Sequence, residues 1–159
     1  MITYILITLW VLFLIAVPVV MIFGIKSTSY KFKHFEDIEI PYVTMDIQGN
    51  LFNMVVDSGC AVSLLNVPSI RGCELMYQKT DKEVALSALT SDRIESRAIN
   101  VKFNIGKKEV SEDFYLQNHE DFGNFERMHG ITIHGLLGSS FFHKNNCKID
   151  FEKHELIVL

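Results

Sequence analysis

The stretch VVDSGCAVSLL, residues 55–65, places one carboxylate between two hydrophobic runs. Asp57 follows two valines and stands directly before Ser58 and Gly59. An ionised aspartate is rarely buried without a partner, so its position among apolar residues needs an explanation. Asp-Ser-Gly is favourable turn chemistry, and an ordinary turn is the simpler interpretation of these residues alone. The alternative is a carboxylate held in position for catalysis.

The residues before Asp57 predict a pair of strands. Residues 42–49, YVTMDIQG, alternate apolar and polar side chains with period two, which is typical of a half-buried strand. Gly49-Asn50 is a hairpin signal. Residues 51–56, LFNMVV, predict the return strand, so the chain enters Asp57 from a hairpin.

A similar arrangement recurs in the second half of the chain. Residues 99–106, INVKFNIG, alternate in the same way, Gly106-Lys107 predicts the turn, and residues 109–117 return. Each half therefore contains an alternating strand, a glycine turn and a return strand, followed by a glycine-containing loop. Three further elements are expected, namely a hairpin tip at residues 90–92, a short helix at residues 139–146 and a closing hairpin at residues 147–159.

The N-terminal segment predicts a membrane anchor. Residues 2–25 contain no charged side chain, and a helix of this length spans about 36 Å, against about 30 Å for the bilayer hydrocarbon core. A cleaved signal peptide is the alternative, but Met1 leads directly into apolar residues and the apolar run is too long. Three lysines follow the segment and no basic residue precedes it, so the positive-inside rule predicts a cytosolic C-terminal part.

These features divide the 159 residues into a single-pass anchor at residues 1–25, a polar linker at residues 26–39 and one domain at residues 40–159. The net charge of −4 does not indicate a basic surface for binding nucleic acid, so nucleic acid is not an expected partner. The three cysteines have no paired spacing and predict no disulfide framework; they fit reduced thiols in a cytosol.

Taken together, the motifs resemble those of the retropepsin-like aspartic peptidases. Residues 55–63 resemble that family's hydrophobic-hydrophobic-Asp-Thr/Ser-Gly-Ala motif. Residues 135–142, GLLGSSFF, resemble its later hydrophobic-hydrophobic-Gly element, which a short helix follows. The last twelve residues resemble a closing hairpin found in cellular and bacterial members. The resemblance covers roughly residues 40–159 and implies an all-β domain, a closed retropepsin-like (acid protease) β-barrel with one short helix.

The resemblance implies an aspartic endopeptidase that acts on polypeptides and works as a symmetric homodimer. The reaction needs one carboxylate as base and a protonated carboxyl as acid, and two carboxyls that share a site split their pKa values. The chain has one Asp-Ser-Gly motif. Asp150 lies in an alternating strand with no glycine turn and is interpreted as structural. Asp57 of each subunit is therefore expected to face its copy across a two-fold axis, and a shared membrane anchor would favour that pairing.

Other site residues follow from the same resemblance. Ser58 is expected to hydrogen-bond across the dimer, and Gly59 to let the backbone approach the carboxylate. Cys60 stands where the family often has alanine; some relatives carry a hydroxyl there that favours acid pH, so a weakly donating thiol predicts activity nearer neutral pH. Two groups complete the site: Leu137 and Gly138 beneath the loop, and a flap near Leu89, Thr90 and Ser91. The segment around this flap has none of the glycine that the family often carries, and an ordinary exposed hairpin is the alternative.

Other chemistries fit less well. A Cys60 nucleophile would need a histidine partner, and the six histidines show no such pattern. His129, His134 and His143 lack the spacing of a zinc site, so we expect no metal and no organic cofactor. GLLGSS lacks the Gly-x-Ser-x-Gly spacing of a serine hydrolase. The main rival is a membrane-tethered binding or assembly module that keeps Asp57 without catalysis, since fold does not dictate function.

Overall fold

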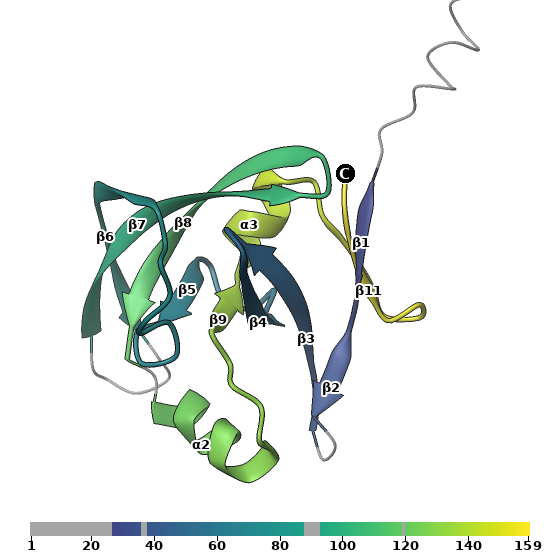
Figure 1. Ribbon diagram of the computed structural model, residues 1–159, viewed down its shortest axis with the longest axis horizontal. Coiled ribbons are helices and arrows are strands. Elements are labelled where there is room, and N and C mark those ends of the chain that lie inside the picture. Colours follow the sequence, from purple (N-terminus) through teal and green to yellow (C-terminus); the bar gives the residue numbers. More distant parts are fainter. Residues whose placement is uncertain (1–26, 36–37, 88–92, 119) are drawn as a thin grey trace, which may run out of the picture.

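The computed structural model describes residues 27–35, 38–87, 93–118 and 120–159 (Figure 1). Within these ranges, no helix is both long enough and apolar enough to cross a membrane. The anchor expected at residues 1–25 lies outside the described residues. The flap expected at Leu89, Thr90 and Ser91 lies outside them as well.

The described residues form mostly β-structure with two helices. The strands are β1 (Thr28–Lys31), β2 (Lys33–Phe35), β3 (Ile38–Ile47), β4 (Asn50–Val56), β5 (Ser63–Asn66), β6 (Tyr77–Ser87), β7 (Arg93–Ile105), β8 (Lys108–Gln117), β9 (Gly135–Leu137), β10 (Lys148–Asp150) and β11 (Glu155–Val158). The helices are α2 (Glu120–His129) and α3 (Ser139–Lys144).

Eight strands form one sheet in the order β2-β3-β4-β9-β5-β8-β7-β6, and β1, β11 and β10 form a second sheet. Most neighbours are antiparallel, but β4 pairs with β9 and β5 pairs with β8 in parallel. The larger sheet is open within the described residues, because β2 and β6 are edge strands. The backbone hydrogen bonds between strands therefore do not close the sheet into a barrel, and the expectation of a closed barrel is wrong in this respect.

Side-chain hydrogen bonds link the two ends of the open sheet, here called its two arms: strands β3 and β4 on one side and β6 and β7 on the other. The amide of Gln48, in the turn between β3 and β4, donates to the carbonyl oxygens of Met76 and Lys102 at 2.9 and 2.8 Å. Its oxygen accepts the N–H of Met76 at 2.7 Å. The β3–β4 turn is thus held to β7 and to Met76, the residue before β6, without a strand ladder.

The main core lies on the inner face of the curved sheet. Val43, Met45 and Ile47 are at most 1% exposed, as the period-two pattern predicts. Phe103 and Phe114 pack on the same core from β7 and β8. Helix α3 adds Phe141 and Phe142, which confirms the short helix expected after Gly138.

The structure also corrects two predictions and adds a helix. β1 and β2 occupy residues expected to be a linker, and β1 pairs with β11 in antiparallel register. The first hairpin turns at Gln48-Gly49, with Ile47 opposite Asn50, one residue earlier than expected. Helix α2 was not predicted, because its sequence, EDFGNFERMH, is polar and contains a helix-weakening glycine.

Candidate active site

Asp57 stands at the end of two parallel strands that are far apart in sequence. Val56 of β4 lies opposite Leu137 of β9, and the N–H of Asp57 donates to the carbonyl of Leu137 at 3.1 Å. The Oδ1 atom of Asp57 accepts the N–H of Gly59 at 2.9 Å. The Asp-Ser-Gly turn therefore orients its own carboxylate, while Asp57 stays partly exposed and Ser58 is exposed.

The loop of residues 57–62, here called the Asp57 loop, packs on the junction between β9 and α3. A Cβ atom on Gly138 would lie 2.2 Å from the carbonyl oxygen of Val62, so a larger residue does not fit there. Ser139 donates its N–H to the Cys60 carbonyl at 2.8 Å, and its hydroxyl lies 2.9 Å from the carbonyl oxygens of Ser58 and Cys60. Leu137 is fully buried. The structure thus brings Leu137 and Gly138 against the Asp57 loop.

A buried polar cluster, which the sequence motifs did not predict, supports this junction from inside. The hydroxyl of Ser63 donates to Oε1 of Glu112 at 2.9 Å and accepts the N–H of Gly138 at 3.2 Å. Ser140 donates to the same carboxylate oxygen at 3.2 Å. Burial raises the pKa of Glu112, although these hydrogen bonds and Lys144 oppose the rise. The available signal was Glu112's place on the apolar face of its strand, two residues from Val110 and Phe114.

An apolar row crosses the sheet on the face that carries Asp57. Residues two apart in a strand share a face, so Val55 and Asp57 lie on the same side. Directly opposed residues share a face across neighbouring strands. The register therefore defines a continuous row of six side chains, the apolar row: Tyr42, Val55, Leu136, Leu64, Tyr115 and Ala98.

Of the other residues considered for the site, Cys60 and Ser58 belong to the Asp57 loop, whereas Asp150 lies at the end of β10. Cys60 carries a free thiol that donates to the Val62 carbonyl at 3.2 Å. Ser58 lines a surface hollow of about 470 Å³ together with residues of α3 and the segment after it. Asp150, the last residue of β10, accepts the N–H of Lys153 at 2.9 Å and pairs with Lys148 at 3.6 Å, which fits its interpretation as a structural strand residue.

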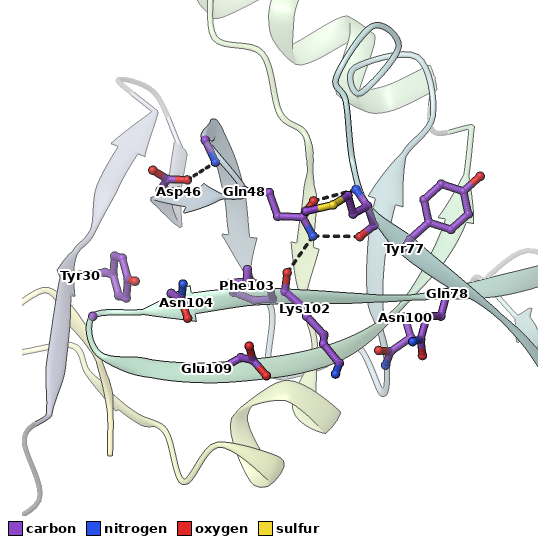
Figure 2. Close-up of a pocket in the computed structure, with 13 residues that line it drawn as sticks. Tyr30, Asp46, Gln48, Tyr77, Gln78, Asn100, Lys102, Phe103, Asn104 and Glu109 are labelled. Carbon is purple, nitrogen blue, oxygen red and sulfur yellow. Dashed lines mark hydrogen bonds between the residues drawn. The ribbon is translucent and has the colours of Figure 1, made fainter.

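A larger cavity, of about 800 Å³, lies away from the Asp57 loop (Figure 2). Its lining includes Tyr30, Asp46, Gln48, Tyr77 and Lys102, and no residue of the Asp57 loop. The close-up shows Gln48 crossing this space to reach the backbone of the opposite wall. Size alone therefore favours this cavity, and its Asp46 carboxylate accepts the N–H of Gly49 at 2.7 Å, but Asp57 of the Asp-Ser-Gly motif lies elsewhere.

Among the described residues, no three histidine, cysteine or acidic side chains are grouped so that they could hold a metal ion. His134 instead stacks on Phe52 with ring centroids 4.8 Å apart, and its Nδ1 accepts the N–H of Asn53 at 3.1 Å.

No protein-family model matches the sequence, and the curated proteins give no match. Solved structures do resemble it. A retropepsin-like aspartic protease from Rickettsia conorii superposes with a TM-score of 0.51 at 18% identity, over 84% of this chain and 91% of that chain. The chain has a retropepsin-like fold. The retroviral protease-like domain of Ddi1 from Leishmania major aligns at 15% identity, over 77% of this chain and 94% of that chain, with a TM-score of 0.44.

Proposed function

We propose that this retropepsin-like chain is a membrane-anchored aspartic endopeptidase that works as a homodimer. The observation that carries the proposal is the position of Asp57. Its backbone is fixed at the ends of β4 and β9, the N–H of Gly59 donates to its carboxylate, and its loop is exposed. A carboxylate held in this way and open to solvent can activate a water molecule.

The second carboxyl is proposed to come from another copy of the chain. Asp150, the other candidate from the sequence, is engaged by Lys148 and by the N–H of Lys153. A two-fold axis through an interface brings identical residues together, and the exposed Asp57 loop leaves room for a partner. The hydroxyl of Ser58 would hydrogen-bond across this axis.

The reaction then needs one proton shared between the two Asp57 carboxyls. The ionised carboxyl takes a proton from water, and the oxygen of that water attacks the peptide carbonyl. The protonated carboxyl donates to the carbonyl oxygen, and breakdown of the tetrahedral intermediate passes a proton to the leaving amine. The titration belongs to the pair, because two adjacent carboxyls do not both ionise easily.

The proposal is tested with the full chain and two matched variants, Asp57→Asn and Asp150→Asn. A diverse peptide library is incubated with each protein between about pH 4 and pH 8, and the cuts are identified by mass spectrometry. We expect cuts by the parent and by D150N, inhibition by pepstatin, and no cuts by D57N. A folded, dimeric parent that cuts no peptide would contradict the proposal. A cutting rate that is still rising at the acid end of this range would contradict the expected effect of Cys60.

We further propose that residues 2–25 form a single-pass anchor and that the folded domain faces the cytosol. The support is the uncharged sequence of the segment and the lysines that follow it. Alkaline extraction of membranes should leave the chain in the pellet. Protease added to intact cells should spare the domain, and its digestion there would contradict the cytosolic orientation.

A second candidate function is a binding module without peptidase activity. One observation favours it: Leu64, Leu136 and Ala98 of the apolar row are at most 7% exposed. A peptidase groove needs such side chains to be open to substrate. In the library experiment, a parent that binds peptides but does not cut them identifies this function.

A further inference from the structure

Helix α2 lies in the long connection between β8 and β9, at the edge of the fold seen below β5 and β9 in Figure 1. Its Phe122 packs against the cluster of Leu64, Ala98, Tyr115 and Leu136. Phe122 and Phe125 also pack against the neighbouring cluster of Tyr42 and Ile133. The helix thus places aromatic side chains on the apolar row.

The Asp57 loop contacts the same cluster. Cys60 and Val62 pack against it, as does Val55, which precedes Asp57 by two residues on the same face. Phe122 and the candidate catalytic loop therefore meet on one group of apolar side chains. If a peptide bound at Asp57 extends over this shared group, its side chains compete with Phe122 for the same apolar surface.

Helix α2 contributes little to the core, although it covers this row. None of its residues is buried, and Gly123 in its interior lowers its helix propensity. Its C-terminal end is held by a 2.7 Å hydrogen bond from the hydroxyl of Thr132 to Glu126 and by the N–H of Gly130. Helices with few buried contacts belong to the low-stability parts of a fold. The helix can therefore shift while the main core stays intact.

We propose that Phe122 is a specificity-determining residue that fills the apolar row and gives way to a large apolar side chain of the substrate. The part of the inference that concerns the substrate rests on the proposed peptidase function. The packing of Phe122 over the apolar row, here called the covering contact, does not depend on catalysis. A small or charged side chain gains too little from burial in the row to replace Phe122.

The covering contact is tested by thiol accessibility in the full chain. Leu136→Cys introduces a thiol into the row, and its alkylation by a maleimide is followed by mass spectrometry, which separates it from the native cysteines. We expect slow alkylation, at least tenfold faster after Phe122→Ala and unchanged after Met128→Ala, an exposed position on the same helix. Equal rates with and without Phe122 overturn the inference. Ala98→Cys repeats the measurement at a second position if Leu136→Cys does not fold.

The substrate effect is tested by binding to the Asp57→Asn protein, which keeps peptides intact. Two matched peptides carry either phenylalanine or alanine at one central position. Phe122→Ala should tighten binding of the phenylalanine peptide by about fivefold and leave the alanine peptide within twofold. Weaker or unchanged binding of the phenylalanine peptide overturns displacement of Phe122. If alkylation depends on Phe122 but no peptide binds or is cut, the cover is real and both the displacement of Phe122 by substrate and the proposed function fail.

Discussion

Ser63 donates a 2.9 Å hydrogen bond to Glu112 where β5 leaves the Asp57 loop. Both residues are at most 2% exposed, and the hydroxyl of Ser63 also accepts the N–H of Gly138. The buried carboxylate of Glu112 therefore holds Ser63, and Ser63 in turn holds Gly138, the residue on which the Asp57 loop packs. The nearest cation, Lys144, lies 3.9 Å from the carboxylate, so burial outweighs its attraction and the pKa of Glu112 is raised.

Glu112→Gln should reduce the dependence of stability on pH. Because the pKa of Glu112 is higher in the folded state, the folded protein holds this proton more tightly than the unfolded chain. Glu112 therefore favours folding below its ordinary pKa of 4.5, and this contribution is lost as pH rises through the raised value. The glutamine keeps an oxygen acceptor for Ser63 but has no proton to lose. Urea unfolding at several pH values measures the slope, and an unchanged slope in E112Q contradicts the assignment.

Glu112→Ala should be more harmful than the glutamine variant. It leaves the hydroxyls of Ser63 and Ser140 without their buried acceptor, which costs about 1–3 kcal/mol of unfolding free energy. The comparison of E112A with E112Q at neutral pH isolates this loss from the effect of charge. Equal stability of the two variants would show that the hydrogen bonds contribute nothing.

Gly138→Ala should destabilise the protein and disturb the Asp57 loop. The added methyl group would meet the Val62 and Cys60 carbonyl oxygens at 2.2 and 2.9 Å, and overpacking of this kind costs about 1–3 kcal/mol. Gly123→Ala is the matched control, because its Cβ meets nothing within 4 Å and alanine favours the helix by about 0.5–1 kcal/mol. Denaturant unfolding should shift in opposite directions for the two variants. A neutral G138A would contradict the close contact.

His134 should make stability fall on mild acidification. Burial lowers its pKa from the ordinary value of 6.5, and its neutral Nδ1 accepts the N–H of Asn53. The unfolded chain then binds this proton more readily than the folded one, so the contribution is complete above pH 6.5 and declines as pH falls below it. His134→Phe keeps a ring on Phe52 but cannot titrate. Unfolding free energies at about pH 7.5 and about pH 5 should differ less in H134F than in the parent.

Gln48→Ala should loosen the two arms of the open sheet. The substitution removes three hydrogen bonds to Met76 and Lys102 and leaves a backbone φ of 56°, which alanine adopts poorly. We expect a loss of about 1–3 kcal/mol, since each lost hydrogen bond contributes about 1 kcal/mol and some groups are rehydrated. Gln78→Ala, on the wall of the same cavity, serves as the control. Equal melting temperatures of the two variants would contradict this role for Gln48.

Several elements could be predicted because their causes are local. The period-two patterns around Val43 and Phe103 follow from burial of one sheet face, and the turn at Gly106-Lys107 follows from glycine's freedom at positive φ. Helix α3 follows Gly138 as expected. Helix α2 could not be predicted in this way, because Phe122 and Phe125 become a helical face only when the sheet offers them an apolar surface.

The sequence by itself determined most strands, the turn at Gly106-Lys107 and the Asp-Ser-Gly motif, since alternation and turn chemistry act over a few residues. Only the tertiary structure decided which distant residues meet. The parallel pairing of β4 with β9 joins Asp57 to Leu137, and the pairing of β5 with β8 carries the apolar row under Phe122. Parallel neighbours require long connections, so their register depends on packing of the whole domain and leaves no local pattern in the chain.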